Sequence, residues 1–192
     1  LLRIPNVSTF EKILGQHCGL AMVGIKAANL VCLKHKDFAD IHGEICLLGE
    51  ALSPAGIVLR VLDDNGNRIL LLVYREKALE QRLREPDARR LLTRFGYPDG
   101  VGVDALIDRL SGGFRKGGGF PHEIGIFLGY PAEDVIGFIR NPDGCKMCGA
   151  WKVYGDVNKA KETFARYEKC SAAIKRRMDR GDDLKTIFAK AI

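Results

Sequence analysis

Apolar residues recur every three or four positions in several segments of the chain, and this period predicts helices. Between residues 37 and 51, with Leu52 directly after, it brings five apolar side chains to one face, and Ser53-Pro54 then ends the helix. A shorter helix is expected from Ser8-Thr9, which can cap it, to a point near Gly15. The five apolar residues of the first of these helices are Phe38, Ile41, Ile45, Leu48 and Leu52.

Two apolar runs flank the sequence DDNGN and predict a β-hairpin. Residues 56–62 and 68–75 would form its strands, and Asn65-Gly66 supplies the positive φ angles of a tight hairpin turn. Both runs are apolar at successive positions, so the sheet is expected to be covered on both faces. Two further strands are predicted at 20–25 (LAMVGI) and 150–155 (AWKVYG).

The rest of the chain predicts mainly helices. Segments 76–84 and 87–95 are parted at Pro86, segment 104–110 is another short helix, and 111–119 (SGGFRKGGG) has the composition of a loop. Pro121 and Pro131 fit first helical positions, and Asn158 fits the cap of a long last helix. Glycines at 125 and 137 predict close packing of two helices or of a ligand. The pattern predicts an α+β fold, with a small, mostly antiparallel sheet of about four strands packed by helices, in one domain over 1–192.

Composition narrows the class of protein. The chain has 192 residues, 46% of them hydrophobic and 28% charged, as in ordinary globular proteins. It contains no apolar run of the roughly 20 residues that cross a bilayer, and no signal peptide is recognisable, so a cytoplasmic protein without membrane contact is expected.

The net charge of +6 is concentrated near the C-terminus. Residues 158–192 hold ten Lys and Arg against five acids, so the preceding chain is nearly neutral. Such a basic helix can bind nucleic acid or an acidic protein, although the interspersed acids favour a solvated helix face. The candidates for binding are Lys169, Arg176, Arg177 and Arg180.

Six scattered cysteines favour free thiols in a reducing compartment over a disulfide scaffold. Cys145 and Cys148 form a Cys-x-x-Cys pair after Asp-Gly, which resembles half of a zinc ribbon. A structural site needs four ligands, so a metal or metal cofactor, such as zinc, iron or haem, would require further residues. Unliganded thiols and thiol redox chemistry remain open alternatives. The candidate additional ligands are His17, Cys18, Cys170 and His122.

A second candidate site lies around residue 120. His122 and Glu123 could act as an acid/base pair at a helix start, but Ile126 stands where a helical zinc motif needs its second histidine. The alternative is a structural role, with Glu123 offsetting the helix dipole. The preceding glycine-rich loop could cradle an anion. Trp151 is expected to be a core or rim residue, and the alternative is that its aromatic ring stacks on a flat cofactor. The candidate cofactor-binding residues are Arg115, Lys116, Gly118, Trp151 and Lys152.

Several motifs together resemble a known family. They are FPHEIGIFLGYPAEDVIGFI (120–139), the Cys-x-x-Cys pair followed by GAWKVYG (149–155), HC-x5-GIKAANL (17–30), LLLVYR (70–75), and Tyr167 with Cys170 in the last helix. In these residues the chain is similar to an uncharacterised bacterial domain family of unknown function, found mainly in anaerobes. The resemblance implies a fold unit of this size and a cytosolic, anaerobic setting, and it implies no reaction. Gly19-Leu20-Ala21 departs from the Ala-Pro-Thr-like turn expected there.

These observations support three hypotheses. The first is a metal- or cofactor-binding accessory protein of anaerobic metabolism that uses the Cys/His residues. The second is a small enzyme with His122 and Glu123 beside an anion-binding loop. The third is a module that binds nucleic acid or an acidic protein through the C-terminal basic helix. The oligomeric state is left open.

Overall fold

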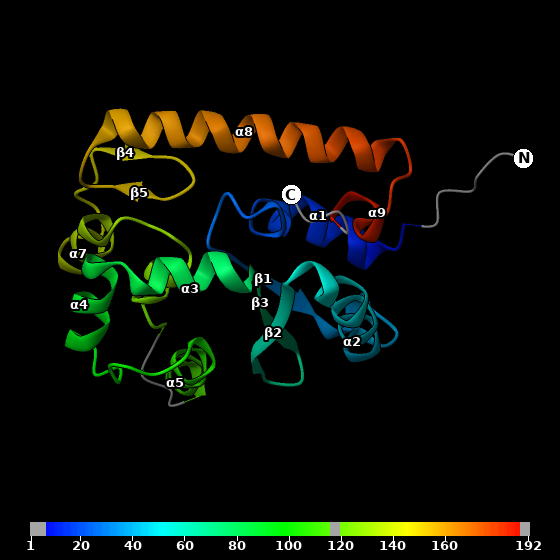
Figure 1. Ribbon diagram of the computed structural model, residues 1–192, viewed down its shortest axis with the longest axis horizontal. Coiled ribbons are helices and arrows are strands. Elements are labelled where there is room, and N and C mark those ends of the chain that lie inside the picture. The colour runs from blue at the N-terminus through cyan, green and yellow to red at the C-terminus, as the bar shows by residue number, and fades with distance from the viewer. Residues whose placement is uncertain (1–6, 116–119, 189–192) are drawn as a thin grey trace, which may run out of the picture. The chain divides into compact units, whose positions relative to one another are not determined.

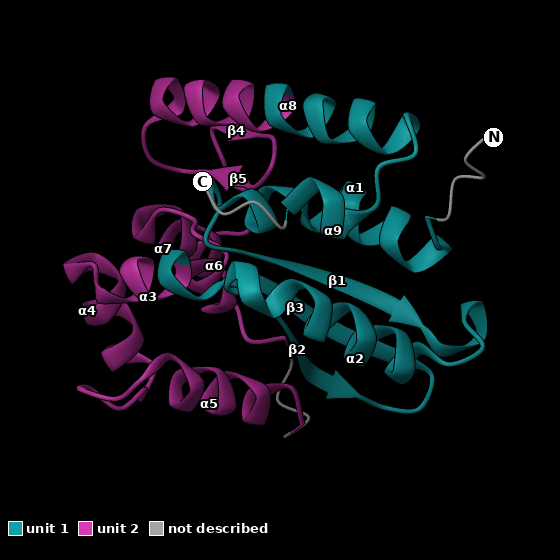
Figure 2. Cartoon of the chain, turned by 45° about the vertical axis from the view of Figure 1, so that its right-hand side comes forward, with its two compact units in different colours: residues 1–78, 169–192 teal, residues 79–168 magenta. Residues whose placement is uncertain are grey.

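The computed structural model describes residues 7–115 and 120–188. The chain divides into two compact units, one formed by residues 1–78 and 169–192 and the other by residues 79–168 (Figure 2). We call them unit 1 and unit 2. Small antiparallel sheets packed with helices confirm the predicted α+β class. Among the described residues, no helix combines the length and apolar composition needed for a membrane span.

Unit 1 holds a three-stranded antiparallel sheet in the order β1-β3-β2. The predicted hairpin is confirmed as β2 and β3, with Gly66 at φ 78° in the turn. The central strand β3 is buried at six successive positions, as its unbroken apolar run predicts. The elements are α1 (Thr9–Val23), β1 (Ala28–Lys34), η1 (His35–Asp37), α2 (Ile41–Leu52), η2 (Ser53–Ala55), β2 (Ile57–Asp64), β3 (Arg68–Arg75) and α9 (Leu184–Phe188) (Figure 1).

The strand predicted at 20–25 is wrong, because these residues form the end of α1. Ser8 and Glu11 make a capping box that starts this helix, and Gly24, at φ 92°, ends it in the left-handed conformation. Apolar residues occur in succession here because several sides of the helix end are buried. The strand of this region is instead β1, which pairs with β3 from Ala28 to Lys34.

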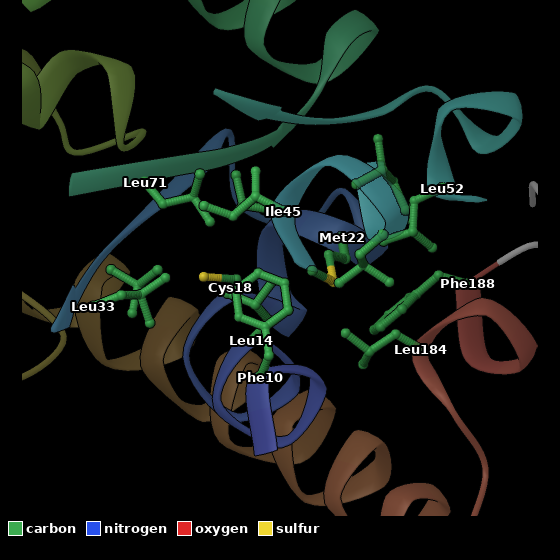
Figure 3. Close-up of a cluster of buried hydrophobic side chains, with 14 of the residues drawn as sticks. Phe10, Leu14, Cys18, Met22, Leu33, Ile45, Leu52, Leu71, Leu184 and Phe188 are labelled. Carbon is green, nitrogen blue, oxygen red and sulfur yellow. The ribbon is translucent and has the colours of Figure 1, made fainter. Parts of the chain in front are cut away.

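Apolar side chains from both ends of the chain meet in the core of unit 1 (Figure 3). Helix α1 packs on β1 and β3, α2 packs on β2, and α9 packs on α1. Each element therefore contributes one apolar face to a common cluster. Figure 3 labels ten members: Phe10, Leu14, Cys18, Met22, Leu33, Ile45, Leu52, Leu71, Leu184 and Phe188.

Unit 2 is mostly helical. The predicted helices at 76–84, 87–95 and 104–110 are confirmed as α3, α4 and α5, with α3 beginning in the last residues of unit 1. The loop predicted at 111–119 is wrong over 111–115, where α5 continues because Leu110 and Ser111 are buried. The bounds are α3 (Glu76–Arg84), α4 (Pro86–Arg94), α5 (Val103–Arg115), α6 (Ile124–Phe127), α7 (Ala132–Arg140), β4 (Met147–Cys148) and β5 (Lys152–Val153).

Helix α8 (Val157–Asp179) belongs to unit 2 up to Glu168 and to unit 1 from Lys169. The predicted cap at Asn158 is wrong. Asp156 instead accepts hydrogen bonds from the backbone N–H groups of Asn158 and Lys159, and so satisfies donors at the helix start. The segment predicted as a strand at 150–155 contributes only Lys152–Val153, which pair with β4 in a short separate hairpin.

Candidate functional site

The main candidate site is an apolar pocket of about 480 Å³ in unit 2. It lies between the turn before α6, the helices α6 and α7, and the start of β5. Three of the residues singled out in the sequence, His122, Trp151 and Lys152, meet in its wall. The remaining lining residues are Phe120, Ile124, Gly125, Leu128, Tyr130, Asp134, Val135 and Phe138.

Glycines let the elements around the pocket approach each other closely. A Cβ at Gly125 would meet the side chains of Val135 and Tyr130, and a Cβ at Gly137 would overlap the ring of Tyr154. At Gly125 this confirms the predicted close packing of two helices, because Val135 belongs to α7. At Gly137 the close neighbour is Tyr154, which follows β5, so the packing there is not between two helices. The side chains of Val135 and Tyr130 fill the space beside the Cα atom of Gly125, and the Tyr154 ring fills the space beside the Cα atom of Gly137.

Asp134 in α7 fixes the wall that carries Trp151. Its side chain is 3% exposed and accepts three hydrogen bonds of 2.7 Å, from Trp151 Nε1 and from the backbone N–H groups of Tyr154 and Gly155. A buried carboxylate with three donors is well satisfied and holds its partners firmly. The sequence does not predict this role, because an acid in the first turn of a helix is explained by the helix dipole alone.

Aromatic rings form much of the pocket wall. Trp151 stacks on Tyr130 with 5.1 Å between ring centroids and an interplanar angle of 26°. His122 meets Phe138 edge to face at 5.2 Å and lies 6.4 Å from Phe120. Trp151 is buried and Phe120 is 51% exposed, so the rings run from the protein interior to the surface.

Lys152 brings a positive charge to this apolar pocket. Its Nζ lies 5.6 Å from the centroid of the Phe138 ring and donates a 2.6 Å hydrogen bond to the carbonyl of Pro142. The nearest acid is Asp143, whose carboxylate oxygen is 3.8 Å away and whose side chain is fully exposed. A solvated pair of this kind holds the ammonium weakly, so Lys152 can pair with an incoming anion.

His122 and Glu123 have different partners. The exposed His122 lines the pocket, whereas Oε1 of Glu123 accepts a 3.1 Å hydrogen bond from the hydroxyl of Tyr97. Burial, together with the neighbouring Glu123, raises the pKa of Tyr97 well above its usual value, so the phenol keeps its proton and donates. Glu123 therefore forms a hydrogen bond with Tyr97, whereas His122 lines the pocket.

The anion cradle predicted from the glycine-rich loop falls largely outside the described residues, which exclude Lys116 and Gly118. Arg115 is described, and it is exposed at the end of α5.

The sulfurs of Cys145 and Cys148 lie 3.3 Å apart at the β4–β5 hairpin. The hydrogen bond between the two thiols raises the pKa of Cys145, followed by a smaller effect of burial. Among the described residues of unit 2, no third His, Cys, Asp or Glu ligand atom lies within 4.8 Å of both sulfurs. This geometry supplies two ligands of the four that a structural zinc site needs.

Three of the other predicted ligands, Cys18, Cys170 and His17, belong to unit 1, whereas His122 belongs to unit 2. Cys18 is fully buried in the apolar cluster, and Cys170 is partly buried against it. Burial raises the pKa of Cys18 to about 12 and also raises the pKa of Cys170. His17 is exposed on α1. Both thiols are thus protonated at neutral pH, which disfavours metal binding through them in this arrangement.

The basic residues at the C-terminal end of α8 are only partly free. Arg177 donates to Asp182 Oδ2 at 2.8 Å and contacts the carbonyls of Ile187 and Thr186. Lys169, Arg176 and Arg180 are exposed.

Comparison with known proteins gives one match. The model of a family described as "Protein of unknown function (DUF3793)" matches residues 14–188. No curated protein and no solved structure matches the chain.

Proposed function

Because the chain belongs to this family of unknown function, whose description carries no activity, we propose a function from the geometry of unit 2. Unit 2 binds a small, planar and mostly apolar molecule that carries one acidic group. This is a specific form of the cofactor-binding hypothesis, with the pocket in place of a Cys/His metal cluster.

The observation that carries the proposal is one pocket that combines aromatic walls with a single ammonium group. Its volume of about 480 Å³ falls within the roughly 300–1,000 Å³ of small-molecule sites. The rings of Phe120, Phe138 and Trp151 offer faces and edges on which a planar molecule can stack. Selectivity for planar ligands follows from this lining.

Charge supports an acidic ligand. Asp134 also lines the pocket, but its carboxylate oxygens already accept three hydrogen bonds, which stabilise its charge and occupy its acceptor positions. Lys152 donates to the carbonyl of Pro142, and among the described residues its ion-pair partner is the exposed Asp143. A carboxylate or sulfonate of the ligand beside Lys152 would therefore find an ammonium group that is only weakly paired, and His122 could donate a hydrogen bond to it.

The thiol pair lies beside the pocket, because Cys148 is the partner of Lys152 in the β4–β5 hairpin. This position, and the lack of a third ligand atom near the two sulfurs among the described residues of unit 2, support a role for the thiol pair next to a bound molecule. They do not favour a structural zinc site. All six cysteines are free thiols. They support, as part of the proposal, a reducing bacterial cytoplasm as the setting.

The test uses two fluorescent probes that differ in one group. 8-Anilinonaphthalene-1-sulfonate is planar, apolar and anionic, and N-phenyl-1-naphthylamine has the same ring system without the sulfonate. Trp151 is the only tryptophan, so energy transfer from it to a bound probe reports occupancy of this pocket. Titrations would compare the wild-type chain with Lys152→Gln, Phe120→Ala and Lys146→Gln. The last is the control, because Lys146 is an exposed lysine of the same hairpin region outside the pocket.

We expect saturable binding of one anionic probe per chain. Lys152→Gln should raise the Kd of the anionic probe about 5- to 10-fold, because a charge-assisted contact is worth roughly 1–1.4 kcal/mol at a partly exposed site, and should leave the neutral probe nearly unchanged. Phe120→Ala should weaken both probes, and Lys146→Gln neither. Equal effects of the two lysine substitutions, or binding without energy transfer from Trp151, would overturn the proposal.

A further inference from the structure

Two of the four histidines of the chain point at one carboxylate in unit 1, away from any motif recognised in the sequence. His35 Nε2 lies 2.9 Å from Oδ1 of Asp64, and His42 Nε2 lies 2.9 Å from Oδ2 of the same residue. The two imidazole rings are 5.6 Å apart between centroids. The three ligand atoms all lie within 4.8 Å of one another.

The topology of the sheet brings these residues together. Strands β1 and β2 both pair antiparallel with β3, so they run in the same direction and terminate at the same end of the sheet, on either side of β3. Lys34, the last residue of β1, pairs with Arg68, and Asp64, the last residue of β2, pairs with Ile69. Both pairs lie at the start of β3, so Asp64 and His35, which follows β1, are close to each other. His42 then reaches the same point from the first turn of α2, whose start is fixed by Asp40 as its cap.

The carboxylate is held in place before any ligand arrives. Its Oδ1 accepts a 2.8 Å hydrogen bond from the backbone N–H of Gly66 in the hairpin turn. This hydrogen bond orients the carboxylate, whose two oxygens each lie 2.9 Å from one imidazole Nε2 atom. A hydrogen bond behind a ligand atom is the outer-shell support that metal sites commonly show.

We propose that His35, His42 and Asp64 bind a divalent transition metal ion of the Zn²⁺, Co²⁺ or Fe²⁺ class. Two imidazoles and one carboxylate form a donor set that these ions prefer over Mg²⁺ or Ca²⁺. Tetrahedral bonds of about 2.0–2.2 Å place ligand atoms roughly 3.3–3.6 Å apart, so the N–O distances of 2.9 Å need to open by about 0.4–0.7 Å. Each imidazole would bind the ion through Nε2 as the neutral Nδ1–H tautomer, so the proton that Nε2 directs at the carboxylate moves to Nδ1 of the same ring through exchange with solvent.

Exposure indicates an open coordination site. The side chains of His35 and Asp64 are about a quarter exposed, and that of His42 is 59% exposed. Three protein ligands with solvent access leave at least one position for water or an exchangeable ligand, as in catalytic zinc sites. The site belongs to unit 1 and uses none of the pocket residues of unit 2, so it stands independently of the function proposed above.

The experiment separates this site from the thiols. Chelator-treated, reduced full chain without a His tag is titrated with Zn²⁺ by calorimetry, in the wild-type form and in a Cys145→Ser, Cys148→Ser background. The test variant in this background is His42→Gln, which changes an exposed side chain. The matched control is His17→Gln, because His17 is also an exposed histidine on a helix of unit 1.

We expect one equivalent of Zn²⁺ in the Cys145→Ser, Cys148→Ser background and in the control. His42→Gln should weaken binding by at least about 100-fold, more than the 10- to 100-fold typical of a lost outer-shell partner. Asp64→Asn, which keeps an acceptor for Gly66, should do the same while preserving the circular dichroism spectrum. The Co²⁺ form should show visible ligand-field bands without thiolate charge transfer.

Three outcomes would overturn the proposal. The first is no saturable binding at equimolar metal, and the second is equal affinity in the His42→Gln and His17→Gln variants. The third is binding that is lost when Cys145 and Cys148 are replaced but is kept when His42 is replaced.

Discussion

Replacing Asp134 by Asn tests whether one buried carboxylate holds the pocket wall. The side chain accepts 2.7 Å hydrogen bonds from Trp151 Nε1 and from the backbone N–H groups of Tyr154 and Gly155. Asn has nearly the same shape, but one of its two terminal atoms is an NH₂ donor. In either orientation of the amide, this donor faces a group that also donates.

The cost follows from the better of the two orientations. The amide oxygen can keep both backbone N–H groups, which share Oδ1, and the NH₂ group then faces the indole N–H. This loses a hydrogen bond to a charged group, worth roughly 1.5–3 kcal/mol, and leaves buried donors unpaired at roughly 1–3 kcal/mol. Because the two contributions overlap, we expect the free energy of unfolding of unit 2 to fall by about 2–4 kcal/mol.

The assay is urea unfolding followed by the emission of Trp151, which reports unit 2 because it is the only tryptophan. Asp143→Asn is the matched control, since the Asp143 side chain is fully exposed and its loss should change stability by less than about 0.5 kcal/mol. A loss of stability for Asp134→Asn no greater than that of the control would refute the role given to its hydrogen bonds.

Three further predictions concern buried groups. Burial lowers the pKa of Lys26 to about 8 and raises that of Cys18 to about 12. Between pH 8 and 9 the unfolded chain thus binds more protons than the folded chain, through Lys26, and above pH 10.5 it binds fewer, through Cys18. Stability should therefore rise by about 1 kcal/mol up to pH 9 and fall above pH 10.5, as chemical denaturation at each pH would show; a monotonic change would contradict it. Cys18 should be the last thiol to react with a disulfide reagent, and its labelling before the exposed thiols, located by mass spectrometry, would be incompatible with its burial. Gly137→Ala should lower the melting temperature, at a cost of about 1–3 kcal/mol, because its Cβ overlaps the Tyr154 ring; an unchanged melting temperature would show that the ring moves freely.

The sequence predicted the elements that depend on local patterns. The β2–β3 hairpin follows from Asn65-Gly66 between two apolar runs, and α2 follows from one apolar stripe. The misassigned strand at 20–25 shows the limit of this reasoning, because an apolar run fits a strand and a deeply buried helix end equally well. The true strand, β1, carries Asn29, whose Oδ1 accepts the backbone N–H of Ala21, a contact that no local pattern reveals.

The candidate sites depend on contacts between distant residues. His122, Trp151 and Lys152 could each be selected by residue type, but their meeting in one pocket depends on the packing of α7 against both α6 and β5. The role of Asp134 in holding the pocket wall is visible only from the three donors that surround its carboxylate. His35, His42 and Asp64 are brought together by the register of β1 and β2 on β3, and their spacing in the sequence matches no motif.

Unit 1 is assembled from two stretches of chain that are separated by the whole of unit 2. Its core joins Phe10 and Leu14 of α1 to Leu184 and Phe188 of α9. During synthesis, α9 therefore cannot cover α1 until residue 188 has left the ribosome. Unit 2 is one continuous stretch and is complete by then. Synthesis order therefore favours folding of unit 2 first, while the nascent α1 keeps an apolar face available to chaperones.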